Sequence, residues 1–72
     1  MVRQPSEESW RPRRSLRAVR EAFPLSLYEL ALESGLAEST IQAVEKRKRR
    51  PRARTMRELA SALKVEVGDI AW

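Results

Sequence analysis

The sequence predicts an all-α fold, a compact bundle of four to five helices, and three observations carry the prediction. Four successive segments place apolar residues at the spacing of one helix face. Short connections containing Pro or Gly separate most of these segments, and 72 residues are enough for one domain only. No segment alternates apolar and polar residues over a useful length, so we expect no strand.

The first helix is expected to begin after Ser15 and to end at Pro24. Ser15 can cap the start of a helix, and Pro24 cannot continue one. One face of this helix carries Leu16, Val19, Arg20 and Phe23. The preceding residues, 1–14, hold two Pro, four Arg and no helical periodicity. We therefore expect a flexible basic N-terminal arm at 1–14 and a folded domain at 15–72.

The second and third helices are expected to lie on either side of Gly35. Ser26 and Glu29 have the spacing of a capping box at the start of the second helix. Gly35 can leave that helix in a left-handed conformation. The third helix should run from Glu38 to about Lys46. Its inward side chains are expected to be Ile41 and Val44; its mostly outward ones are expected to be Glu38, Ser39, Gln42 and Ala43.

The last third of the chain predicts a fourth helix and a short final element. The fourth helix follows Pro51, and its apolar face consists of Met56, Leu59, Ala60 and Leu63. The final stretch "VEVGDIAW" is interpreted as a short fifth helix or a turn. Two alternatives stay open for its apolar end. Ile70 and Trp72 form a dimer surface, or Trp72 folds back to complete a small core.

Charge is distributed in blocks along the chain, which has a net charge of +5. Residues 21–45 contain five Glu and no basic residue, whereas residues 46–54 contain seven basic residues and no acidic one. So many cations in so short a segment repel one another, and their simplest use is to bind a polyanion such as nucleic acid.

Composition argues against several other functions. The chain has no His and no Cys, the commonest general base and two common metal ligands, and we recognise no phosphate-binding loop or catalytic carboxylate pair. We therefore predict no enzyme activity, no catalytic residue, no metal and no cofactor. No apolar run approaches the length of a membrane span, and the N-terminus lacks the apolar core of a signal peptide. The expectation is a cytoplasmic protein without a membrane partner.

The spacing of the second and third helices is typical of a helix-turn-helix, although an ordinary αα-hairpin has the same spacing. Residues 16–70 also resemble the Cro and phage-repressor-like helix-turn-helix domain, the Xre family. The matching positions are Leu30, Ala31, Gly35, Ile41, Glu45, Pro51, Leu59, Ala60, Leu63, Lys64 and Val65. Three positions depart from the family pattern, and one of them is Pro24, which stands where the family often has Gly. Leu27 replaces a common Gln that holds a phosphate, and Arg47 replaces a common Gly, so the third helix is expected to run on.

The resemblance implies a lambda-repressor-like bundle and a sequence-specific DNA-binding transcriptional regulator that acts as a homodimer on double-stranded DNA. It implies that the third helix enters the major groove and that Arg20 and Glu45 form a structural ion pair. The base contacts it implies are Glu38, Ser39, Gln42 and Ala43. We predict phosphate contacts from Arg13, Arg14, Arg17, Thr40, Lys46, Arg47, Lys48, Arg49 and Arg50.

A different class of function stays open, namely an antitoxin-like or adaptor module that uses this fold to hold a toxin or another protein. The acidic stretch 21–45 favours this alternative. Leu27 also favours it, because a hydrophobe cannot donate a hydrogen bond to a phosphate.

Overall fold

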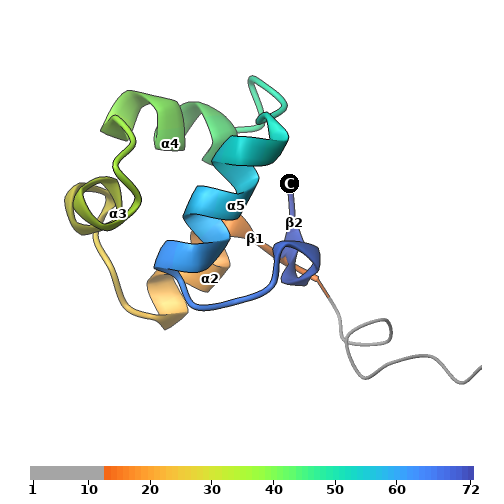
Figure 1. Cartoon of the computed structure of the whole chain (residues 1–72), viewed down its shortest axis with the longest axis horizontal. Coiled ribbons are helices and arrows are strands. Elements are labelled where there is room, and N and C mark those ends of the chain that lie inside the picture. The colour runs from red at the N-terminus through yellow and green to blue at the C-terminus, as the bar shows by residue number, and fades with distance from the viewer. Residues whose placement is uncertain (1–12) are drawn as a thin grey trace, which may run out of the picture.

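The computed structural model describes residues 13–72, and the predicted helices are present (Figure 1). The elements in chain order are β1 (Arg14–Ser15), α2 (Leu16–Ala22), α3 (Leu27–Ser34), α4 (Glu38–Glu45), α5 (Ala53–Ala62), the 3₁₀ turn η1 (Val67–Asp69) and β2 (Ile70–Ala71). Helices α3 and α4 lie side by side, and α5 packs against α3 and η1. The predicted all-α bundle with a helix-turn-helix is therefore confirmed.

The helix ends follow the local sequence signals. The hydroxyl of Ser15 accepts a hydrogen bond from the backbone N–H of Ala18 at 3.1 Å, which caps α2. Ser26 and Glu29 form a complete capping box at the start of α3, with both hydrogen bonds at 3.0–3.1 Å. Gly35 ends α3 with φ 74°, a conformation that is cheap only for a residue without Cβ.

A single small core joins all the helices and both ends of the described chain. Every member of this core is at most 4% exposed, and the set is Leu16, Val19, Leu30, Ile41, Val44, Leu59, Leu63 and Ile70. Burying these side chains removes their apolar surface from water, which is the main stabilising contribution to a fold of this size. Half-buried Leu25, Leu27 and Leu36 pack at its edge.

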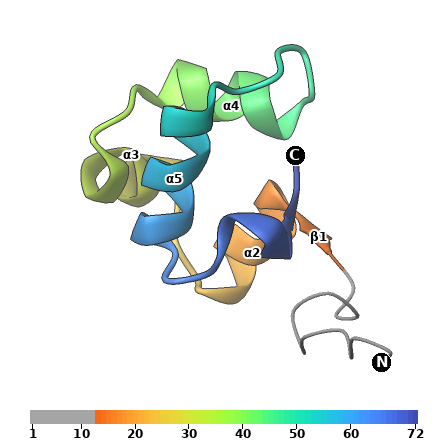
Figure 2. The same cartoon turned by 45° about the vertical axis from the view of Figure 1, so that its right-hand side comes forward.

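The expectation of no strand is wrong, because β1 and β2 form a short parallel pair with Arg14 opposite Ile70 and Ser15 opposite Ala71. This pair joins the two ends of the described chain, as Figures 1 and 2 show. Each strand has only two residues, too few to show a periodicity in the sequence. Arg14, expected to belong to the arm, is part of this pair. Residues 1–12 of the predicted arm lie outside the described residues.

One detail of the predicted apolar faces differs from the structure, and one open alternative is decided by it. Helix α2 ends at Ala22, so Phe23 is its C-cap and is 39% exposed rather than buried on the helix face. The final stretch, expected to be a short fifth helix or a turn, contains the 3₁₀ turn η1. Trp72 folds back there, packs against the core and donates its indole N–H to the carbonyl of Val67 at 3.0 Å. The second alternative for Trp72 is therefore observed, and Ile70 is in the core.

Candidate nucleic-acid interface

Helix α4 presents a polar face to solvent. Ile41 and Val44 are buried against the core, as expected from their spacing. Glu38, Ser39 and Gln42 are exposed, and Ala43 and Thr40 are half-buried at the edges of the outward face. The described residues leave the Gln42 amide without a hydrogen-bond partner, so its donor and acceptor are both available to a ligand. The residues predicted to read bases thus share one side of one helix.

The orientation of α4 is fixed by Arg20 and Glu45, which form the ion pair that the resemblance implies. Arg20 Nε lies 2.7 Å from Glu45 Oε2, and Arg20 Nη2 lies 3.1 Å from Glu45 Oε1. Arg20 Nη1 also donates to the carbonyl of Leu25 at 2.9 Å. The Arg20 and Glu45 side chains are only 11% and 8% exposed. Because α2 holds the end of α4 bidentately, α4 has one defined position on the core.

Hydrogen bonding to Glu45 raises the pKa of Arg20 above its usual value. Burial of the guanidinium acts in the opposite direction, and electrostatic attraction to Glu45 and Glu21 adds to the increase. Arg20 is therefore a permanent cation at any pH at which the protein is folded.

The expectation that α4 runs on past the missing Gly is wrong. The helix ends at Glu45, and Arg47 takes the left-handed conformation itself, with φ 55°. The Arg47 N–H donates to the carbonyl of Val44 and the Lys48 N–H to the carbonyl of Ala43, both at 3.0 Å, which is the Schellman pattern. These two bonds satisfy carbonyls at the helix end and offset the left-handed cost of about 1–2 kcal/mol for a residue with a side chain.

One flank of α4 carries a hollow of about 240 Å³, whose lining holds the Arg20–Glu45 pair and two further cations. Its lining includes Gln42 and Lys46 from α4 and its cap, Arg17 from α2, and Leu27 from the first turn of α3. Arg17 Nε lies 3.4 Å from Glu21 Oε2, and both side chains are exposed. Such a pair holds the Arg17 side chain only weakly. Leu27 contributes apolar surface here and packs against the core. A side chain that packs thus stands where the resemblance implies one that donates a hydrogen bond to a phosphate.

The other flank of α4 carries a second hollow, of about 250 Å³, which we name the α5 hollow. Its lining residues are Thr40, Val44, Arg49, Arg50, Pro51, Arg52 and Thr55. Arg52 and Thr55 were not among the predicted site residues. Arg52 belongs to the basic run 46–54, which was a usable signal. Thr55 has no such signal, because only the turn at buried Pro51 brings it beside Thr40.

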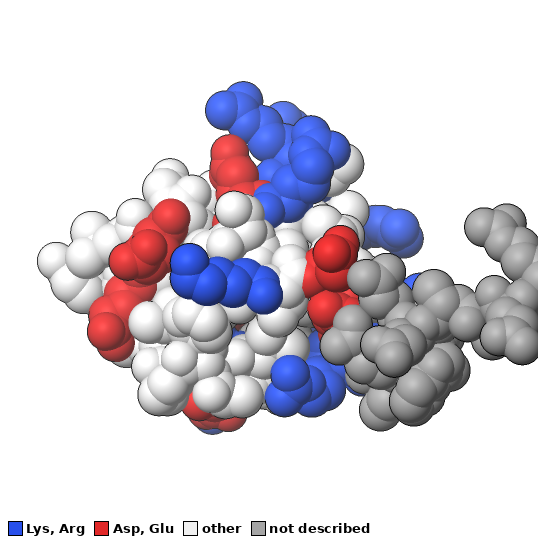
Figure 3. All heavy atoms as spheres, turned by 60° about the horizontal axis from the view of Figure 1, so that its bottom comes forward, with Lys and Arg blue, Asp and Glu red and all other residues white. Residues whose placement is uncertain are grey.

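The remaining predicted phosphate ligands, Arg13, Arg14, Arg47 and Lys48, lie outside these two hollows. Lys48 is exposed and lines none of the hollows described here. Arg14 is exposed on β1, and Arg13 lines a third hollow together with Arg47. Figure 3 shows a dense cluster of Lys and Arg at the upper edge of the molecule, whereas most of the Asp and Glu side chains on this face lie away from it.

Among residues 13–72, no three acidic side chains come together as metal ligands would. None of the helices there is both long enough and apolar enough to cross a bilayer.

Comparison with known proteins identifies the family. The helix-turn-helix family model matches residues 16–70. Among solved structures, the chain is similar to the restriction-modification controller protein C.AhdI from Aeromonas hydrophila, with 37% sequence identity and a TM-score of 0.72. That alignment covers 75% of this chain and 82% of the controller protein. No curated protein matches the chain significantly. The chain belongs to the Xre and Cro-like helix-turn-helix family of DNA-binding transcription regulators.

Proposed function

We propose that the chain is a sequence-specific regulator that inserts α4 into the major groove of double-stranded DNA. One observation carries this proposal: α4 exposes Gln42 and its polar neighbours between two hollows whose linings include cationic side chains. A helix fits the major groove, and the phosphates of the two strands then lie on either side of it.

Base recognition is assigned to the outward face of α4. The Gln42 amide can bond to N6 and N7 of adenine at the same time. Glu38 can accept from cytosine N4, and Ser39 can contact several bases. Ala43, at the edge of the face, can touch a thymine methyl group. Gln42 is the strongest of these candidates, because a carboxylate at a helix start such as Glu38 is already stabilised by the helix dipole.

Phosphate binding is assigned to the cations beside α4. Arg17 and Lys46 serve one strand. On the other flank, the phosphate ligands of the α5 hollow are Thr40, Arg49, Arg50, Arg52 and Thr55. Arg13, Arg14, Arg47 and Lys48 extend this surface. Such contacts supply affinity and register but carry little sequence information.

The similarity to a restriction-modification controller supports a more specific proposal. The chain controls transcription of a gene set of that kind and binds as a homodimer to a near-palindromic site in the cytoplasm. A two-fold protein on a two-fold site doubles the number of base and phosphate contacts.

A second candidate function, a protein-interaction module of the antitoxin or adaptor kind, is favoured by the outer face of α3. Tyr28 is 61% exposed and Leu32 is 65% exposed, one helical turn apart, beside the exposed Glu29 and Glu33. An apolar pair flanked by carboxylates fits a protein partner, such as a toxin with basic side chains, and would be repelled by DNA.

Selection of bound sequences from a random DNA pool tests the leading proposal. The expected result is one shared motif made of two inverted half-sites. A bound pool without any shared motif would contradict sequence-specific regulation and would favour the α3 face as the functional surface. Alanine at both Tyr28 and Leu32 provides the control, because it should leave the selected motif unchanged.

A further inference from the structure

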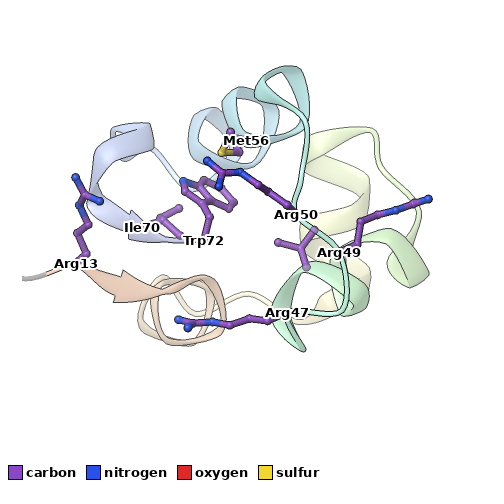
Figure 4. Close-up of a pocket in the computed structure, with 8 residues that line it drawn as sticks. Arg13, Arg47, Arg49, Arg50, Met56, Ile70 and Trp72 are labelled. Carbon is purple, nitrogen blue, oxygen red and sulfur yellow. The ribbon is translucent and has the colours of Figure 1, made fainter.

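A third hollow, of about 400 Å³, lies between the basic loop after α4 and the C-terminal strand, and none of the predicted base-reading residues lines it (Figure 4). We name it the C-terminal hollow. Val44 and Ile70 line it and are only 4% and 1% exposed, so they give it an apolar base. Half-buried Met56 and Trp72 complete the apolar lining. Its volume lies within the roughly 300–1,000 Å³ of small-molecule sites.

The other lining residues that the structure describes are cationic. Arg13, Arg47, Arg49 and Arg50 line the hollow, and no acidic residue within 13–72 does. None of these four arginines forms an ion pair with another residue in the described range 13–72. Like charges held close together repel one another, and a bound anion would remove that repulsion.

Two of the four arginines are directed at the site. In Figure 4 the Arg50 side chain extends toward Trp72, whereas Arg49 points away from it. Arg47 reaches back to β2, where its Nη2 donates to the carbonyl of Ala71 at 3.4 Å. That long hydrogen bond uses one of five guanidinium donors, so the others are available to a ligand.

We propose that the C-terminal hollow binds a small organic anion, a flat apolar body carrying one carboxylate or phosphate. The body would lie on the apolar base against Met56 and the Trp72 indole. The charge would meet the guanidinium groups of Arg50 and Arg47, whose planar donors match either anion. Apolar surface beneath unpaired cations suits such a ligand better than it suits a bare phosphate.

The site also suggests a regulatory role, which rests on the proposed DNA-binding function. Arg49 and Arg50 line both the C-terminal hollow and the α5 hollow beside Thr40. Because Arg50 is the one of these two that extends toward Trp72, a ligand and a DNA phosphate compete for its guanidinium group. Bound anion lowers DNA affinity, and DNA lowers anion affinity by the same factor.

Ligand binding can be tested without DNA by two-dimensional ¹H–¹⁵N NMR on the full chain, with 2-naphthoate as the probe. We expect saturable shifts of the Trp72 indole N–H and of the backbone amides of 47–50 and 70–72. Inorganic phosphate and the neutral 2-naphthalenemethanol should each bind at least about tenfold more weakly. Phosphate lacks the flat apolar body, and 2-naphthalenemethanol lacks the negative charge.

Two matched variants separate the site from general charge. Arg50→Ala should weaken naphthoate binding at least about tenfold. Arg57→Ala removes the same charge from a different hollow and should leave it unchanged. Equal losses in the two variants, or phosphate binding as tight as naphthoate binding, would overturn the proposed site. If naphthoate binds but leaves DNA affinity unchanged, the ligand site stands and the coupling to DNA is overturned.

Discussion

Arg20 and the arginines of the loop after α4 carry the same guanidinium group in opposite surroundings. Arg20 is buried, and it is held by two hydrogen bonds to Glu45 and one to the carbonyl of Leu25. Arg49 and Arg50 are exposed, with no acidic partner in the described part of the chain. The same side chain thus holds α4 in place at one site and is available to a ligand at the other.

The difference teaches how to assign roles to charge in a small basic protein. A charge whose partners are inside the fold contributes to stability, and its removal leaves an unpaired partner. A charge without a partner contributes little to stability and is available for binding. Substitutions at the two kinds of position should therefore change different measurements.

The largest effect is expected for Glu45→Ala, because it leaves the Arg20 cation buried without its carboxylate. Breaking a buried pair in this way costs about 3–5 kcal/mol, a large share of the stability of any small domain. Urea unfolding followed by circular dichroism measures the change.

The control is Glu58→Ala, which breaks the exposed pair with Arg54 at 3.1 Å. It should cost less than about 1 kcal/mol. Similar losses in the two variants would remove the distinction between buried and exposed pairs. The double variant Arg20→Met with Glu45→Met sharpens the test. It should recover part of the loss, since it leaves no charge unpaired.

The next effect concerns Gln42, a polar side chain without a partner inside the fold. Gln42→Ala should lose discrimination at one or two base pairs, by about 1–3 kcal/mol for a bidentate contact. Stability and binding to random DNA should hardly change. Fluorescence anisotropy with a selected site and its single-base variants measures this. An equal loss of affinity on selected and random DNA would show that Gln42 is not a reader.

A smaller effect is expected at Arg47, whose left-handed backbone conformation (φ 55°) is energetically unfavourable for a residue with a Cβ atom. Arg47→Gly removes the left-handed strain but also loses the bond to Ala71 and adds chain entropy to the unfolded state. The net change should be a stabilisation of no more than about 1 kcal/mol, together with weaker DNA binding. Arg47→Ala keeps the strain, so it should not be more stable than the parent protein. Thermal unfolding of the three proteins would contradict this account if Arg47→Ala were the most stable.

The smallest effect concerns Glu29, a carboxylate satisfied within its own helix turn. Hydrogen bonds from the backbone and side chain of Ser26 lower the pKa of Glu29 below its usual 4.5. The contribution to stability is therefore present above the unfolded pKa and is lost as the pH falls through the folded pKa. Ser26→Ala should move the pKa of Glu29 back toward 4.5, and NMR titration of the side chain measures it. An unchanged pKa would assign the shift to the backbone N–H alone.

Much of the fold was predictable because its signals are local. Ser15, the Ser26 and Glu29 pair, and Gly35 mark helix ends through bonds made within a few residues. The core positions Leu30, Ile41 and Leu59 follow from helical spacing. The buried Arg20 was predictable as well, because it stands on an apolar helix face and the family supplies a carboxylate for it.

The features that were missed depend on parts of the chain far apart in sequence. The β1–β2 pair joins residues 14–15 to 70–71, and two-residue strands leave no pattern. Thr55 reaches the site only because the chain turns at Pro51. The prediction that α4 runs on past Arg47 was wrong because it considered only the free-energy cost of a left-handed backbone at that residue. The two Schellman hydrogen bonds offset this cost.

A salt titration of DNA affinity on a selected site and on a scrambled one tests the central claim most directly. If a dimer neutralises about eight to ten phosphates, log affinity on the selected site should fall with log salt at a slope of roughly −7 to −9. Replacing Arg49 and Arg50 by Ala should make the slope shallower by roughly two to four units and should weaken both sites similarly. At physiological salt the parent protein should clearly prefer the selected site. Equal affinity for the two sites, with a slope unaffected by the Arg49 and Arg50 substitutions, would contradict the account.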